Sequence, residues 1–267
     1  MTQQEFGVVR QAPYLVPDHM ALKRAWELLE AAGEREPPTD VEKLARYLGV
    51  TRIKYEQFLR ADACLVPNTN GQVVIINASS GKRRQRFSLA HEIGHLLLGR
   101  GGMRFRNGRD PHSEEERLAN IIAAELLIPT RALLRIASDL QPSLEAVKSL
   151  SDKFHAALEP TAIKLGELKK PYGASVAYWQ DCHGILRRKW SVGKLPESMM
   201  EERSVRDTAF GPCAALRYEE QAISYESSLG GNLDMVCESE AFGKGYRRFV
   251  LSIARPDTGP HQEGPKT

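Results

Sequence analysis

Cysteine is scarce in this chain, and no two cysteines stand at a spacing that would make a functional pair. The four are far apart and include no CxxC motif: Cys64, Cys182, Cys213 and Cys237. Their separation excludes a cysteine-ligated zinc site and a thioredoxin-like redox site. We therefore expect unpaired thiols in the reducing environment of a cytoplasm.

Long apolar runs and a strong excess of one charge are also missing. No stretch approaches the ~20 apolar residues that a membrane span needs, and the amino terminus lacks the basic-then-apolar plan of a secretory signal. We therefore predict a cytoplasmic protein with no membrane contact. The net charge is only +3, which indicates that direct binding of nucleic acid is weak or absent.

Helical periodicity runs through most of the chain up to residue 168, and short alternating runs follow Pro171. We predict an α+β protein in which strands at 51–56 and 72–77 interrupt the helices. Thr39 and Glu42 have capping-box spacing, which predicts that a helix starts there. The expected divisions are a flexible lead-in, a zinc peptidase domain, a helical segment, a strand-rich domain and a disordered tail, at 1–16, 17–132, 133–170, 171–256 and 257–267.

The sequence HEIGH at 91–95 fits the pattern HExxH on an apolar helix. His91 and His95 are four residues apart, so both imidazoles project from one helical face and can bind one Zn²⁺ at ~2.0–2.1 Å. Glu92 is placed to act as general base, taking a proton from the attacking water and delivering it to the leaving amine. Two histidines and a glutamate are costly to bury in such a helix without a function or a partner. We therefore predict a zinc peptidase, with Mn²⁺ as a substitute ion.

A catalytic zinc usually has three protein ligands, and the third must lie outside this helix. Leu98 and Gly101 stand where the longer HExxHxxGxxH motif would have its glycine and its last histidine. The downstream helix at 113–129 is the natural source, and its candidates are Glu114, Glu115, Glu116 and Glu125, with His112 just before it. Helical geometry leaves Glu115 and Glu116 both open, and Glu116 has a second reading as a capping-box partner of Ser113. His112 is also a candidate oxyanion donor.

The segments RFSLAHEIGHLLLG (86–99) and ERLANIIAAELLIP (116–129) resemble the ImmA/IrrE family of bacterial metallopeptidases. The resemblance covers about residues 39–168 and implies a zincin-like peptidase fold. It also implies that Glu116, which precedes Ala-Asn, is the third zinc ligand and that Asn120 steadies the site from outside the ligand set. The helices at 143–168 look like the helix-turn-helix-like segment of the family.

The family likeness also implies a function and a role for the strand-rich region. Members cleave a helix-turn-helix transcriptional repressor and so induce a DNA-damage, radiation or mobile-element response. We accordingly expect a site-specific zinc endopeptidase with such a repressor as its substrate. In IrrE-type members a GAF-like sensory domain occupies the place of residues 171–256, where a small-molecule signal would bind.

The alternative is a DNA-binding transcriptional regulator with a structural or vestigial zinc site. Its natural DNA-contacting part would be the helical pair at 143–168. The charges of that pair nearly cancel, whereas a helix that contacts phosphates is richer in Lys and Arg. We therefore expect the pair to pack or to dock a substrate.

Overall fold

The computed structural model describes residues 16–57, 59–99, 114–168, 174–182, 185–195, 203–204, 212, 223–228, 234–242 and 249–256. The lead-in before residue 16, the loop with His112 and the tail from residue 257 lie outside the described residues, and the predictions for them stay predictions. The chain separates into two compact units. The first unit contains residues 13–136 and 149–161, and the second contains residues 137–148 and the chain from 162 onward.

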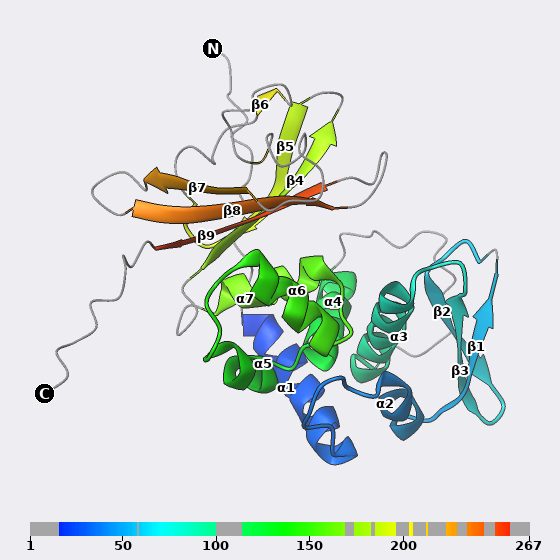
Figure 1. The fold of residues 1–267 in the computed structure, drawn as a ribbon. Helices are drawn as coiled ribbons and strands as arrows, with labels where there is room; N and C mark the ends of the chain where they lie inside the picture. Colours follow the sequence, from blue (N-terminus) through cyan, green and yellow to red (C-terminus); the bar gives the residue numbers. More distant parts are fainter. Residues whose placement is uncertain are drawn as a thin grey trace, which may run out of the picture. The chain divides into compact units, whose positions relative to one another are not determined.

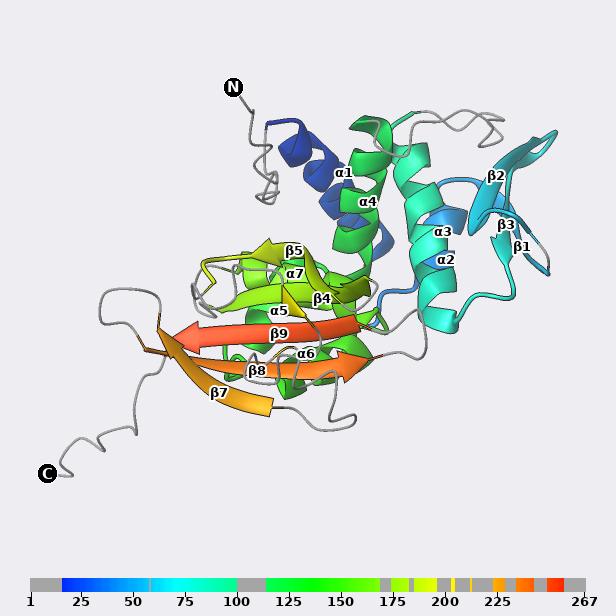
Figure 2. The same ribbon diagram turned by 90° about the horizontal axis from the view of Figure 1, so that it is seen from above.

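Helices lie on one side of a small sheet in the first unit (Figure 1). Its elements in chain order are α1 (Val16–Ala32), α2 (Val41–Tyr47), β1 (Val50–Glu56), β2 (Ala63–Asn68), β3 (Gly71–Asn77), α3 (Lys82–Leu97), α4 (Glu114–Leu127) and α5 (Thr130–Ala137). The strand order is β1-β3-β2, in which β3 runs parallel to β1 and antiparallel to β2. Helix α3 carries HEIGH and lies between α4 and the sheet (Figure 2).

Apolar side chains of α3, α4 and the sheet form the core around this helix. In β3, Val74 and Ile76 are fully buried while their neighbours are partly exposed, which is the alternation of a strand with one covered face. Leu89 and Ile93 of α3 and Ile122 of α4 are buried as well. The HEIGH sequence therefore lies on a helix whose orientation is fixed by packing on two sides.

Two local predictions differ from the structure in the first unit. Helix α2 begins at Val41, and its cap is Asp40, whose carboxylate accepts a hydrogen bond from the Lys43 backbone N–H at 3.0 Å. The predicted start at Thr39 was wrong by one residue, because threonine and aspartate are both good caps and stand side by side. Strand β2 was not predicted, because Pro67 and Asn68 at its end are typical of turns.

An antiparallel sheet of six strands forms most of the second unit (Figure 1), which confirms the predicted α+β class. The strands are β4 (Ser175–Cys182), β5 (Ile185–Val192), β6 (Arg203–Ser204), β7 (Ile223–Ser228), β8 (Asp234–Phe242) and β9 (Phe249–Pro256). Their order is β6-β5-β4-β9-β8-β7, and each neighbouring pair is antiparallel. No helix within the described residues is long and apolar enough to cross a membrane.

The helical pair predicted at 143–168 is present as α6 (Leu144–Lys153) and α7 (Leu158–Glu167), and both helices cross the border between the units. Within the second unit, the Leu144 backbone N–H donates to Oε2 of Glu238 on β8 at 2.9 Å. Gly166 of α7 lies against Val176 and Val192, so close that a Cβ there would stand 2.7 Å from a Val176 methyl. These contacts anchor the ends of α6 and α7 on the sheet.

Candidate metal centre

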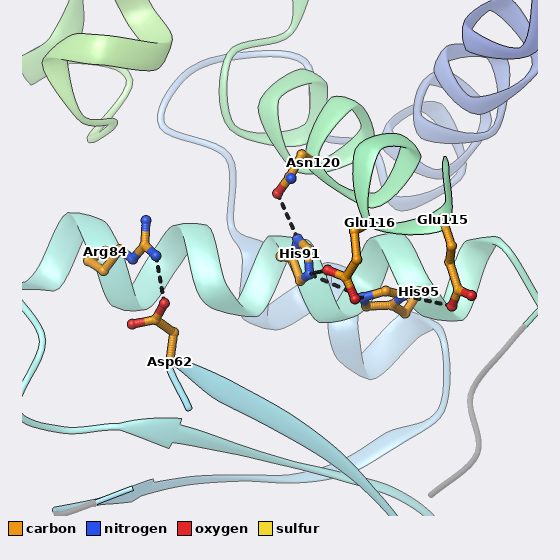
Figure 3. Close-up of polar contacts among 7 residues, drawn as sticks. All are labelled: Asp62, Arg84, His91, His95, Glu115, Glu116 and Asn120. Atoms are coloured by element: carbon orange, nitrogen blue, oxygen red, sulfur yellow. Dashed lines mark hydrogen bonds and ion pairs between the residues drawn. The ribbon is translucent and has the colours of Figure 1, made fainter. Parts of the chain in front are cut away.

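Helix α3 brings the two predicted histidines together. Their Nε2 atoms are 3.1 Å apart, and the ring planes are nearly perpendicular at 82° (Figure 3). His91 is 6% exposed and His95 is 4% exposed. The four-residue spacing thus has the consequence expected from helical geometry, with both imidazoles turned toward one point.

Helix α4 contributes Glu116 to the same point (Figure 3). Its Oε2 is 3.1 Å from Nε2 of His91, and its Oε1 is 3.6 Å from Nε2 of His95. Four ligands at zinc bond lengths on the corners of a tetrahedron would lie about 3.3 Å from one another. The two nitrogens and the carboxylate are thus spaced as three ligands of a single zinc ion. Among the described residues, His91, His95 and Glu116 form a group that could hold a metal ion.

The outer nitrogen of each histidine faces a second residue of α4. Nδ1 of His91 lies 2.9 Å from Oδ1 of Asn120, and Nδ1 of His95 lies 3.2 Å from Oε1 of Glu115 (Figure 3). An acceptor at Nδ1 holds the proton there and leaves the lone pair of Nε2 directed toward the metal position. Glu115 therefore contacts a histidine from outside, whereas Glu116 faces both Nε2 atoms.

Glu92 is buried beside His91 in α3, with 7% of its surface exposed. Its negative charge also affects a side chain of the neighbouring sheet. The pKa of the Cys64 thiol on β2 is raised, first by burial and then by the charges of Glu92 and Glu56. The predicted general base thus lies close enough to β2 for its charge to contribute to the raised pKa of the Cys64 thiol.

A close approach of α3 and α4 makes this arrangement possible. Gly94, between the two histidines, lies so near α4 that a Cβ on it would stand 2.8 Å from the Ala119 carbonyl oxygen. Ala119 is itself one turn from Glu116 and next to Asn120. A glycine at this position lets the backbone of one helix reach the other, and the side chains of Glu115, Glu116 and Asn120 on α4 can then contact the histidines.

The remaining candidate ligands lie apart from the centre. Glu114 is exposed and accepts hydrogen bonds from Arg117, which keeps the pKa of its carboxyl below the usual range. Glu125 is fully buried at the other end of α4, where it accepts hydrogen bonds from Trp26 and Thr130. His112 lies outside the described residues. These positions leave Glu116 as the glutamate of α4 that faces the histidines.

The arginines that precede HEIGH form ion pairs and hydrogen bonds within the first unit. Arg84 forms an ion pair with Asp62 at 2.5 Å (Figure 3), and Arg83 pairs with Asp152. Arg86 donates to the Thr39 carbonyl at 2.9 Å. Burial lowers the pKa of the Arg86 guanidinium. These arginines therefore stabilise the packing of α3 against its neighbours.

Comparison with known proteins relates one region of the chain to a peptidase family. Residues 44–166, a little under half of the chain, match the peptidase-family model described as the IrrE N-terminal-like domain. This region is therefore similar to the ImmA/IrrE family. Two similar proteins are radiation response metalloproteases IrrE: that of Deinococcus radiodurans is 28% identical over 145 residues, and that of Deinococcus deserti is 28% identical over 161 residues.

The alignments with the two Deinococcus proteins cover only part of this chain and part of each relative. The two alignments cover 51% and 57% of this chain and 44% and 55% of the relatives, so the chain spans about half the length of the curated relatives it matches. A solved structure, a Mycobacterium tuberculosis transcriptional regulator, superimposes with a TM-score of 0.63 at 17% identity. It covers 89% of this chain and 76% of its own. At 17% sequence identity, this similarity concerns the fold alone.

Proposed function

We propose that the chain is a zinc-dependent endopeptidase, with His91, His95 and Glu116 as ligands of one catalytic ion. The observation that carries the proposal is the spacing of the three donor groups, which are buried and 3.1–3.6 Å apart. Two nitrogens and one carboxylate are a common donor set of catalytic zinc, because they leave a fourth position open. Mn²⁺ is a substitute ion that the same donors accept.

The side chains around the ion have different roles in peptide hydrolysis. A zinc ion held here supplies a Lewis acid that polarises a carbonyl and acidifies water. Glu92 accepts the proton of the attacking water on its carboxylate and returns it to the nitrogen of the leaving amine. Asn120 holds the Nδ1 proton of His91, so that this ring keeps one orientation throughout the reaction.

The proposed substrate is a helix-turn-helix transcriptional repressor, whose cleavage in the cytoplasm would induce a stress response. The names of the two Deinococcus relatives support a protease that acts in a stress response, since both are radiation response metalloproteases. The repressor as substrate follows from the likeness to the ImmA/IrrE family. Purified chain should therefore cut a cognate repressor into two fragments. Co-expression with repressors encoded near its gene, followed by mass spectrometry of the fragments, identifies both the substrate and the bond that is cut.

Replacing Glu92 by glutamine tests the mechanism. The Glu92→Gln variant should keep its zinc and its fold, because Glu92 is not among the three ligands. It should lose at least about 100-fold in cleavage rate, because an amide cannot accept the proton of water. Zinc content by elemental analysis and cleavage by gel electrophoresis are the measurements. Cleavage at the wild-type rate by Glu92→Gln would exclude this residue as the base.

A DNA-binding regulator with a structural zinc site is the competing function, and the fold likeness to a transcriptional regulator is the observation that favours it. The burial of α7 opposes it. Thr161, Ala162, Lys164 and Leu165 are buried, and Glu159 is the exposed residue near the helix start. A recognition helix needs an exposed face to reach base edges. A gel shift that shows tight, salt-sensitive DNA binding would support the regulator over the peptidase.

We further propose that the second unit is a GAF-like sensory domain that takes a small-molecule signal. Stacked aromatic rings on four neighbouring strands support this: Trp190, Tyr178, Phe249 and Phe242 follow one another at centroid distances of 5.6, 4.9 and 5.5 Å. Aromatic side chains of this kind line many ligand pockets. A rise in thermal stability with a cell metabolite extract, lost in Tyr178→Ala, is the expected result.

A further inference from the structure

We propose that Glu115 is a positioning residue for His95, so that two consecutive glutamates of α4 have different tasks. Glu116 faces the metal position, and Glu115 fixes the histidine that shares that position. This inference rests on the proposed metal site and adds a determinant of its affinity. The spacing of the residues along the chain left both glutamates as candidate ligands, and the contacts of their carboxylates separate them.

The geometry of α4 explains how one helical turn serves both tasks. Consecutive residues of an α-helix point about 100° apart, so Glu115 and Glu116 cannot face the same atom in the same way. Glu116 approaches Nε2 of both histidines, at 3.1 and 3.6 Å. Glu115 instead places Oε1 3.2 Å from Nδ1 on the far side of the His95 ring. Its side chain is 14% exposed, so water competes little for that carboxylate.

A carboxylate at Nδ1 has two consequences for a metal-binding imidazole. It selects the tautomer with the proton on Nδ1, which leaves the lone pair of Nε2 for the ion. It also makes the ring a stronger donor and adds negative charge close to a dication. The outer partner of His91 is the neutral amide of Asn120. The two histidines are therefore unequal, and the charged partner of His95 contributes more to metal retention.

The test is the affinity of purified full-length variants for Zn²⁺, measured by competition with a chelating dye at one fixed pH. Loss of an outer partner typically weakens metal binding by about 10–100-fold. Glu115→Ala should show a loss of this size, and Glu115→Gln should recover part of it, because its amide oxygen still accepts the Nδ1 proton. Glu116→Gln should lose more, because it removes a ligand.

The matched control is Glu114→Gln, which removes a neighbouring carboxylate of the same turn that is exposed and bonded to Arg117. Its Zn²⁺ affinity should equal that of the wild type. The visible spectrum of the Co²⁺-loaded protein adds a readout that a general loss of stability would not move. The ligand-field bands should shift in Glu115→Ala, where the His95 ring is free to turn, and stay in place in Glu114→Gln.

The outcomes separate this inference from the proposed function. Wild-type Zn²⁺ affinity and an unshifted Co²⁺ spectrum in Glu115→Ala, together with metal loss in Glu116→Gln, would overturn the role of Glu115 and leave the metal site standing. Metal loss in Glu115→Ala with full retention in Glu116→Gln would reverse the two roles and overturn the inference. A wild-type chain that binds no Zn²⁺ would refute the proposed function. If Glu115→Ala fails to fold, the same comparison is made with Glu115→Gln.

Discussion

Glu125 shows at the scale of single residues how a buried carboxylate can be structural in the same helix as a proposed metal ligand. Its Oε1 accepts from the Trp26 indole N–H at 2.7 Å and from the Thr130 backbone N–H at 2.8 Å, and its Oε2 lies 2.7 Å from the Thr130 hydroxyl. These bonds join three helices, α1, α4 and α5. The carboxylate also serves the first backbone N–H of α5, a donor that the helix itself leaves unpaired.

Replacing Glu125 by glutamine should destabilise the fold without removing zinc. The donors on Oε1 then meet a neutral amide oxygen in place of a carboxylate, and the Thr130 hydroxyl must change from donor to acceptor. Weaker hydrogen bonds of this kind should cost about 1–3 kcal/mol. Urea unfolding of the metal-free protein measures the loss. The exposed Glu114→Gln is the control and should stay within about 0.5 kcal/mol of the wild type. Equal unfolding midpoints for both variants would contradict the structural role of Glu125.

A further buried acid of the first unit is Asp18, a residue type that often caps helices. The structure starts α1 at Val16, so Asp18 lies inside the first turn and is fully buried. Its Oδ1 accepts from Arg117 of α4 at 2.5 Å. Hydrogen bonds to Glu114 and Asp18 raise the pKa of Arg117 further above its usual range. Asp18 thus forms a tertiary contact between α1 and α4, although aspartate is a residue type that often caps helices.

At the scale of elements, the crossing of α3 and α4 decides whether a metal site forms. The two helices meet at Gly94 and Ala119, and the donor groups lie one turn or less from that contact. Because the contact is with backbone atoms of Ala119, a larger side chain at position 94 cannot be accommodated by a rotamer change. Separation of the helices would carry Glu116 and Asn120 away from the histidines.

The Gly94→Ala variant should therefore weaken Zn²⁺ binding and lower the free energy of unfolding. Helix propensity alone would stabilise this change by about 1 kcal/mol, but overpacking against a backbone typically costs about 1–3 kcal/mol, so we expect a net loss. Chemical denaturation and dye competition are the measurements. Gly81→Ala is the matched control, because a Cβ at Gly81 meets nothing within 4 Å. Its zinc affinity should be unchanged, and unchanged zinc affinity in Gly94→Ala as well would refute the crossing argument.

At the scale of the whole molecule, the border of the second unit matters for how the chain can be divided. The sequence places a boundary near residue 170, between the helical pair and the strands. The structure anchors the same helices on the six-stranded sheet, through Leu144 with Glu238, Lys148 with Glu240 at 2.6 Å, and Gly166 with Val176. Cutting at 170 therefore removes the partners of both helices.

A chain that ends at Leu168 tests this border. It keeps every residue of the metal centre but loses the strands that pack on α7. Each large apolar side chain returned to water costs about 1.5–3 kcal/mol, so the truncated chain should be less stable by at least about 3 kcal/mol and poorly soluble. Thermal unfolding and size-exclusion chromatography compare it with the full chain. A soluble truncated chain with an unchanged melting temperature would support a separable domain at the predicted border.

Much of the fold and part of the site follow from local patterns of the sequence. The helix at 91–95, the strand at 72–77 and the apolar stripe of α6 are periodic over their whole length, and periodicity depends on neighbours along the chain. Strand β2 escaped prediction because an edge strand is specified by its partner β3, and its own residues carry turn signals. The structural roles of Glu125 and Asp18 could not be predicted for a similar reason, since Trp26 and Arg117, their partners, lie 99 positions away in the chain.

The chain's sequence alone determined that His91 and His95 share a helical face and that Glu92 stands beside them. These relations hold within one helix, where 3.6 residues make a turn whatever surrounds it. The choice between Glu115 and Glu116 depended on how α4 is rotated and how near it lies to α3. That rotation is set by packing at Gly94, Ala119 and the apolar residues around them. It cannot be inferred from the spacing of residues along the chain. Only the tertiary structure therefore decided which glutamate faces the metal position and which one holds His95.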